Sequence, residues 1–238
     1  MQVGVYGLGR FGAFWAEMLA TRYEVTAANR SNTRATPAGV RRGNVEDLAG
    51  CNAVFLCVAI SAMEPVLEDL SMILPPGALV LDTCSVKMYP VELMQRILPA
   101  EVEVIGTHPM FGPDSAREPN ARLPMVYSPV RVGSEKSEFW YHEFQALGLE
   151  VHTMSPEEHD RSAASTQGIT HLIGRVLGEL ELESSPIATL GYTRILQLVE
   201  QTCNDPEQLF LDLQRHNPYT AEVRRRLRNA FERIADKI

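Results

Sequence analysis

The feature that most constrains this chain is a glycine-rich string, GLGRFG, at residues 7–12. A short apolar run at residues 3–6 precedes it and is typical of a buried strand. Residues 10–22 follow with apolar side chains at the i, i+3, i+4 spacing of an amphipathic helix. Glycines placed directly between a strand and a helix predict a tight βα turn near the start of the chain.

The alternation of apolar runs and amphipathic stretches continues to about residue 153. It predicts further helices at 63–73 and 137–147, and strands at 23–28, 53–58, 78–82, 102–106, 125–132 and 150–153. Strands that alternate with helices imply a parallel sheet wound by right-handed crossovers. We therefore predict an α/β fold whose residues 1–154 form a doubly wound sheet of the Rossmann type.

The pattern changes at Ser155. The sequence SPEE at 155–158 predicts a helix with a capping serine, a proline in its first turn and an acid at its third position. From there to residue 238 no strand is expected, and Asp205-Pro206 and Asn217-Pro218 each predict the start of a further helix. We expect 155–238 to be a small all-helical domain for substrate binding and dimerisation. Its helices carry apolar residues on more than one side, which favours a homodimer over packing on the sheet domain alone.

The composition is that of an ordinary globular protein, with 45% hydrophobic and 22% charged residues among 238. A net charge of -8 argues against binding to nucleic acid or to an anionic membrane. The four cysteines form no CxxC pair, so we expect reduced thiols in a cytoplasmic protein and no metal site. Neither a signal peptide nor a membrane span is expected, since the apolar runs are only as long as strands.

The glycine string also fits a dinucleotide. Gly7 permits the turn, Gly9 lets the backbone approach a pyrophosphate, and Gly12 lets the helix pack closely on the strand. The free N–H groups at the helix start favour the diphosphate. The alternative is a glycine turn that binds nothing. The residues expected to contact the cofactor are Gly7, Leu8, Gly9, Arg10, Phe11 and Gly12.

The end of the second predicted strand distinguishes NAD from NADP. An NAD-binding fold usually has an acid about 20 residues after the glycines, where it binds the ribose 2′-hydroxyl. This chain has Asn29 there and no carboxylate beside it. Arg30 and Arg34 can bind a 2′-phosphate, with Ser31 and Thr33 as hydroxyl donors. We predict NADP as the cofactor and leave NAD open.

Four further motifs accompany the glycine string. DTCSVK (82–87) and THPMFGPDS (107–115) each begin at the end of a predicted strand, where open α/β sheets bind ligands. EHD (158–160) and TQGITH (166–171) lie in the helical domain. With these motifs, of which HPMFGPDS is the most specific, the chain resembles the prephenate dehydrogenase family of tyrosine biosynthesis from residue 2 to about 220.

The resemblance implies oxidative decarboxylation of prephenate to 4-hydroxyphenylpyruvate, with hydride transfer to a nicotinamide. His108 matches the family's catalytic histidine, and imidazole suits a base near neutral pH. Ser85 matches a serine that hydrogen-bonds the same substrate hydroxyl. His171 lies where the family has a cleft histidine, and Arg194 is the nearest match to the arginine that binds a substrate carboxylate. Lys87 either anchors its loop or adds positive potential for a dianionic substrate.

The resemblance also places the substrate cleft between the sheet edge and the helical domain. His159 and Asp160 are expected to cap or orient a helix there. Three other functions stay open: an arogenate dehydrogenase, an NADP oxidoreductase of the β-hydroxyacid type, and a nucleotide-sensing subunit without turnover. The second normally needs a catalytic lysine where this chain has Gln167 and His171, and the third is expected to lack His108 or Ser85.

Overall fold

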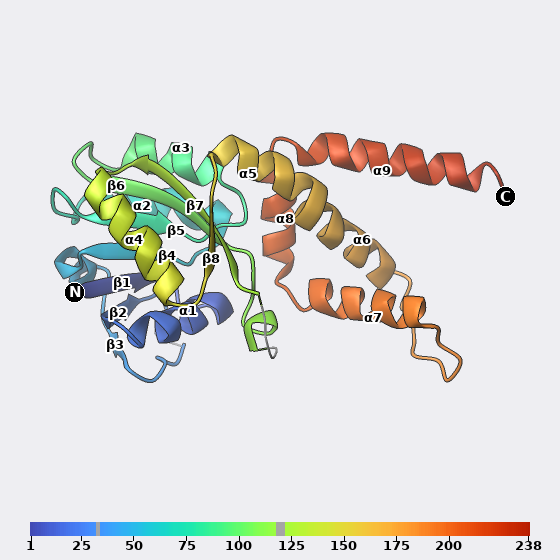
Figure 1. The fold of residues 1–238 in the computed structure, drawn as a ribbon, viewed down its shortest axis with the longest axis horizontal. Coiled ribbons are helices and arrows are strands. Elements are labelled where there is room, and N and C mark those ends of the chain that lie inside the picture. Colours follow the sequence, from blue (N-terminus) through green and yellow to red (C-terminus); the bar gives the residue numbers. More distant parts are fainter. Residues whose placement is uncertain (32–33, 118–121) are drawn as a thin grey trace. The chain divides into compact units, whose positions relative to one another are not determined.

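The computed structural model describes residues 1–31, 34–117 and 122–238 (Figure 1). The chain forms two compact units, Met1–His159 and Asp160–Ile238. The sequence places the domain boundary between residues 154 and 155, close to this division. Each unit is built from its own secondary structure, an α/β unit first and a helical unit second.

The first unit contains an eight-stranded sheet in the order β3-β2-β1-β4-β5-β6-β7-β8. Neighbouring strands in the described chain are parallel, except that β6 and β7 are antiparallel. From β1 the sheet extends through β2 in one direction and through β4 in the other, which confirms the doubly wound fold. The strands are β1 (Gln2–Tyr6), β2 (Glu24–Ala28), β3 (Val40–Arg42), β4 (Ala53–Leu56), β5 (Leu79–Asp82), β6 (Glu103–Pro109), β7 (Pro124–Arg131) and β8 (Glu150–Thr153).

Helices cover both faces of this sheet (Figure 1). On one face, Trp15 of α1 meets Phe55 of β4, and both rings contact Phe144 of α4, with ring centroids 5.7–6.4 Å apart. On the other face α2 packs beside α3. The helices and short turns are α1 (Arg10–Ala20), α2 (Met63–Ser71), α3 (Met88–Ile97), α4 (Ser134–Ala146), η1 (Glu46–Gly50), η2 (Ile60–Ala62) and η3 (Ser115–Arg117).

Three features of the sheet unit differ from the sequence-based expectation. The short edge strand β3 carries no apolar alternation, so its pattern is not visible in the sequence. Helix α3 begins directly after the DTCSVK motif and has Pro90 in its first turn, where proline is tolerated. Strand β7 runs antiparallel to β6, because the described part of the connection between them holds only the short turn η3 and no crossover helix.

The second unit is helical. A capping box opens α5, with the Ser155 hydroxyl accepting from the Glu158 N–H and the Glu158 carboxylate accepting from the Ser155 N–H. One turn of π-helix follows α5 and leads into α6. The elements are α5 (Pro156–Ala163), η4 (Ala164–Gly168), α6 (Ile169–Gly178), α7 (Leu190–Cys203), α8 (Glu207–His216) and α9 (Thr220–Ala235).

Helices α6 and α7 pack closely enough to require a glycine. A Cβ atom on Gly174 would lie 2.1 Å from the Thr202 hydroxyl. The two predicted helix starts are confirmed: Pro206 precedes α8 directly, and the Asn217 side chain accepts from the Tyr219 N–H just before α9. Among the described residues no helix is long and apolar enough to cross a membrane.

Candidate active site

The glycine turn has the shape that a dinucleotide needs. Gly7 has a φ of +107°, and a Cβ there would lie 2.3 Å from the Cys57 carbonyl oxygen. A Cβ on Gly12 would lie 1.9 Å from the Gly7 carbonyl, so only glycine lets α1 start this close to β1. A Cβ on Gly9 would meet no atom of the described residues within 4 Å, and Gly9, as the N-cap of α1, makes no side-chain hydrogen bond to the helix start. An anionic diphosphate fits such an uncapped helix start.

Other residues of the string are held by contacts with the rest of the protein. Leu8 is buried, and its N–H donates to the Asn29 side chain at 3.0 Å. The Phe11 ring stacks on Trp15, with ring centroids 5.8 Å apart. The Arg10 guanidinium pairs with Asp114 of the HPMFGPDS motif. This ion pair connects the glycine turn to the loop that follows His108.

The loop after β2 lies beside the glycine turn. Asn29 accepts from Leu8 and donates to the Ser31 carbonyl at 2.8 Å, so its amide connects the two loops. Arg42 of β3 donates to the carbonyls of Ser31 and Arg34. The expected cofactor residue Thr33 lies outside the described residues.

A cavity of about 310 Å³ opens at this loop and is lined by Arg34, Thr36, Arg42, Gly43, Asn44 and Asp47. Arg30 and Arg34 are exposed. Within the described chain neither guanidinium has a carboxylate partner. The cavity is therefore cationic and polar at the end of β2, where a Rossmann fold binds the adenosine ribose.

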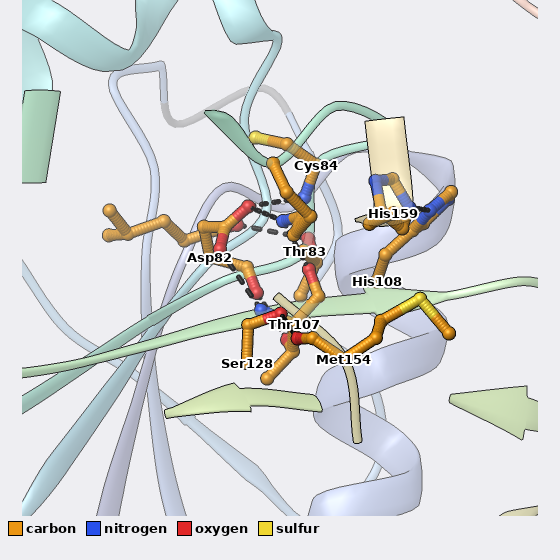
Figure 2. A network of polar contacts seen from close by, with 10 residues as sticks. Asp82, Thr83, Cys84, Thr107, His108, Ser128, Met154 and His159 are labelled. Atoms are coloured by element: carbon orange, nitrogen blue, oxygen red, sulfur yellow. Dashed lines mark hydrogen bonds and ion pairs between the residues drawn. The ribbon is translucent and has the colours of Figure 1, made fainter. Parts of the chain in front are cut away.

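A buried carboxylate organises the ends of β5 and β6 (Figure 2). Asp82 accepts from the Cys84 N–H at 3.0 Å, from the Thr107 N–H at 3.1 Å and from the Lys87 ammonium. The Thr107 hydroxyl donates back to the Asp82 carbonyl. These bonds fix the DTCSVK loop against the strand that carries His108.

Lys87 is fully buried inside this network, where it binds the Asp82 carboxylate and the Thr107 carbonyl. A buried ammonium with these partners holds its loop in place. These contacts favour the first of the two predicted roles of Lys87, anchoring its loop, over a contact with the substrate, because its charge is compensated inside the protein.

Ser85 belongs to the same loop and is only 4% exposed. Its hydroxyl has no hydrogen-bond partner among the residues that the structure describes. A buried hydroxyl without a partner costs free energy unless a ligand or water completes it. Ser85 is therefore suited to bind a ligand group at this edge of the sheet.

His108 lies in β6 and is 3% exposed. Its Nδ1 is 2.8 Å from Nε2 of His159, which is 2% exposed, and the two rings meet edge to face (Figure 2). The sequence predicts a capping or orienting role for His159, but Ser155 and Glu158 cap the helix and His159 contacts the expected base. No spacing in the sequence connects positions 108 and 159, so only the fold identifies this pair.

The helical unit contributes a separate polar stripe along η4 and α6. Three buried atoms in it, Gln167 Oε1, His171 Nδ1 and Arg175 Nε, have no hydrogen-bond partner in the described chain. Burial lowers the pKa of His171, so its ring is neutral at pH 7. The spacing of four residues is the sequence signal for this stripe, and it brings in Gln167 and Arg175, which the sequence analysis does not assign.

Asp205 extends this stripe from the loop before α8. Its carboxylate is 3.8 Å from His171 Nε2, and its backbone carbonyl accepts from Arg175 at 2.6 Å. In the sequence, Asp205 is predicted only to start a helix. Arg194 lies on α7 with its side chain exposed, and it has no ion pair among the described residues.

The cysteines are four free thiols. Burial raises the pKa of the Cys57 thiol to about 12 and raises that of Cys84 as well. Both thiols are therefore protonated near neutral pH, and neither has the thiolate character of a nucleophile.

Two family models match the chain. The model "Prephenate dehydrogenase, nucleotide-binding domain" matches residues 20–123, and "TYRAAT1-like, C-terminal domain" matches residues 176–238. The first covers β2 to β6 with the DTCSVK motif and His108.

Two relatives from Arabidopsis thaliana align with all of this chain. Arogenate dehydrogenase 2, chloroplastic, is 36% identical, and the chain covers 70% of its length. Arogenate dehydrogenase 1, chloroplastic, is 34% identical, and the chain covers 39% of its length.

Solved structures show the same fold. Synechocystis arogenate dehydrogenase aligns with a TM-score of 0.70 at 21% identity, over 100% of this chain and 93% of that one. Prephenate dehydrogenase from A. aeolicus, in complex with hydroxyphenyl propionate and NAD+, aligns with a TM-score of 0.72 at 19% identity, over 100% and 91% of the two chains.

The network around Asp82 predicts a large difference between two lysines. Replacing Lys87 by Met leaves the Asp82 carboxylate buried without its cation, which typically costs about 3–5 kcal/mol of unfolding free energy. Lys136→Met is the matched control, because the pair of Lys136 with Glu103 is partly exposed and is worth about 1 kcal/mol or less. Urea denaturation measures both losses. Adding Asp82→Asn to Lys87→Met should recover part of the stability, and equal losses in the two lysine variants would contradict the prediction.

Proposed function

The chain belongs to the prephenate dehydrogenase family, and we propose that it is an NADP-dependent oxidoreductase that decarboxylates arogenate or prephenate while oxidising C4 of the ring. The observation that carries this proposal is the buried His108 at the end of β6, beside a loop in which the Ser85 hydroxyl has no partner among the described residues. A base and a hydrogen-bonding hydroxyl are the two groups that the oxidation of a ring alcohol needs.

In this proposal, His108 and Ser85 act on the C4 hydroxyl of the substrate. His108 accepts the proton of the C4 hydroxyl as hydride leaves C4, and Ser85 hydrogen-bonds the same oxygen. The C1–carboxylate bond breaks, carbon dioxide leaves, and the electron pair of that bond completes the aromatic ring. The proton then returns from His108 to the phenolate oxygen. The nicotinamide, when bound, accepts the hydride.

The glycine turn and the loop after β2 support NADP as the cofactor. The open space at Gly9 and the uncapped start of α1 fit the diphosphate. Asn29 replaces the usual acid, so position 29 places no negative charge beside a 2′-phosphate. Arg34 lines the adjacent polar cavity, and Arg30 precedes it in the same loop. A guanidinium binds phosphate oxygens in a bidentate manner, and these two are the ligands we propose for the 2′-phosphate.

His171 and Arg194 are the residues we propose for the substrate carboxylates. The neutral, buried His171 ring has a nitrogen without a partner in the described chain, so it can hydrogen-bond a ligand. The exposed Arg194 guanidinium is suited to a bidentate contact with a carboxylate.

Asp205 favours arogenate over prephenate. The two substrates differ only in the side chain, which carries an ammonium group in arogenate and a keto group in prephenate. A carboxylate beside His171 attracts an ammonium and offers no donor to a keto oxygen. We therefore propose arogenate as the preferred substrate.

The helical unit supports a homodimer. Apolar side chains that are exposed in the single chain lie on α6, α7 and α9, among them Phe231 with 74% of its surface exposed. Exposed apolar groups of this kind mark surfaces for association. We propose that a second copy covers them.

The role of His108 predicts a specific kinetic loss. His108→Asn removes the base, so turnover should fall by about two to four orders of magnitude. The dissociation constant for NADP should stay unchanged, because the glycine turn is untouched. Absorbance at the nicotinamide band measures turnover, with His142→Gln on the exposed face of α4 as control. Turnover close to that of the wild type would rule out His108 as the base.

The cofactor assignment predicts a substitution that weakens the binding of NADP but not that of NAD. Arg34→Ala should weaken NADP binding about tenfold or more, since a hydrogen bond to a charged group is worth about 1.5–3 kcal/mol. NAD binding should not change, because it has no 2′-phosphate. Titration of both cofactors measures this, with Arg96→Ala, which only loses a surface pair with Glu64, as control. Equal weakening of both cofactors would contradict a 2′-phosphate site at Arg34.

The substrate assignment predicts a change of preference. Asp205→Asn should lower kcat/KM for arogenate about tenfold or more while leaving that for prephenate unchanged or raising it, because the charge that attracts the ammonium is lost. Glu207→Gln, in the exposed first turn of α8, removes a neighbouring charge as control. If Asp205→Asn lowers kcat/KM equally for both substrates, Asp205 does not discriminate between their side chains.

A further inference from the structure

We propose that His159 is a positioning residue for His108: it accepts a hydrogen bond from His108 Nδ1–H and thereby keeps the Nε2 of His108 unprotonated, as a base requires. The proposal rests on the function proposed above. It starts from one contact, the 2.8 Å separation of His108 Nδ1 and His159 Nε2 between two buried rings.

Three structural elements bring the two rings together. His108 lies in β6, which pairs with β7 so that His108 is opposite Val126. Two residues further along β7, the Ser128 hydroxyl donates to the Met154 carbonyl at 2.6 Å and holds the chain just before α5 (Figure 2). The capping box at Ser155 then starts the helix, and His159 lies one turn into it, with its N–H donating to the Ser155 carbonyl. The strand pairing, the Ser128–Met154 hydrogen bond and the capping box thus fix the positions of the two histidines.

The contact restricts the proton positions on both rings. Two neutral histidines joined through these nitrogens need one donor and one acceptor. If His159 donates, the neutral His108 carries its proton on Nε2 and cannot act as a base there. If His108 donates from Nδ1, its Nε2 is the acceptor that proton abstraction needs. The base role of His108 therefore requires His159 as the acceptor.

The same arrangement stabilises the charge that forms during the reaction. When His108 takes up the substrate proton on Nε2, its Nδ1–H still donates to the neutral His159, and a hydrogen bond to the charged form favours that form. A second proton on the pair would place two N–H donors and two positive charges against each other. The contact therefore accommodates one added proton on the pair, and that proton belongs to the two rings together.

The charged groups near the two histidines are the same in every variant of His159. Asp82 and Lys87 form a compensated pair that binds Thr107, the residue before His108. Glu158 and Asp160 flank His159 in the sequence, and Glu158 is engaged in the capping box. A shift of the acidic limb of the kcat profile between His159 variants is then caused by the replaced ring and not by these charges.

The test compares two replacements of His159. His159→Leu removes the acceptor, whereas His159→Gln keeps one, because its Oε1 can reach the position of Nε2. We expect His159→Leu to lower kcat about ten- to a hundredfold, by analogy with the loss of partners that orient metal-binding histidines, with KM and the NADP dissociation constant unchanged. The acidic limb of the kcat profile should move to lower pH, because the His108 imidazolium loses its acceptor. His159→Gln should restore most of kcat and the position of the limb.

Nitrogen-15 NMR of the ring nitrogens tests the pair without turnover. In the wild-type protein we expect a protonated Nδ1 and an unprotonated Nε2 on neutral His108, and a loss of this preference in His159→Leu. His142→Gln is the control, and urea denaturation checks that each variant is folded. A wild-type His108 protonated on Nε2 would overturn the proposal. So would a folded His159→Leu with unchanged kcat and limb, or a loss that His159→Gln does not rescue.

The two proposals fail in different ways. If the wild-type protein turns over neither arogenate nor prephenate, the proposed function fails, and the NMR result still decides whether His159 sets the tautomer of His108. If turnover is present and the tautomer is wrong, only the inference about His159 fails.

Discussion

The buried Asp82 carboxylate is the group on which the arrangement of the sheet edge depends. It receives hydrogen bonds from the backbone N–H groups of Cys84 and Thr107 and is neutralised by Lys87. A carboxylate in the interior is tolerated only when its charge is paired and its oxygens are bonded, so all four residues must adopt one geometry. That geometry fixes Ser85 in one loop and His108 in the neighbouring strand. The placement of Ser85 and His108 thus depends on the buried Asp82 carboxylate.

Much of the sheet unit could be predicted from the sequence because its signals are local. The glycines between β1 and α1 have one physical explanation each, and the buried strands are apolar runs bounded by polar turns. Strand β3 and the direction of β7 could not be predicted, since an edge strand of three residues has no period and strand direction depends on the connection. His108 and Ser85 are candidates because of their motifs, whereas the sequence leaves the role of Lys87 open between its loop and the substrate, and only the fold shows that it is buried.

The helical unit shows the opposite balance. Its helix starts are legible, because Ser155, Pro206 and Asn217 act locally. Its chemistry is not, because Asp205 reaches His171 only after α6 and α8 are placed within the unit. Gln167 lies in a π-helical turn, a local distortion that is frequent at functional sites, and His171 and Arg175 follow it at intervals of four residues in α6. A sequence shows the spacing of four residues but not that each atom is left without a partner in the described chain.

A neutral partner suits His108 better than a carboxylate would. A carboxylate at the place of His159 would also hold Nδ1–H, but its charge would raise the pKa of His108 and keep the ring protonated near neutral pH. It would in addition repel a substrate that carries two carboxylates. An imidazole at this place orients the proposed base by accepting a hydrogen bond, without adding charge. The pairing of His108 with His159 therefore fits the electrostatics of the proposed reaction as well as its geometry.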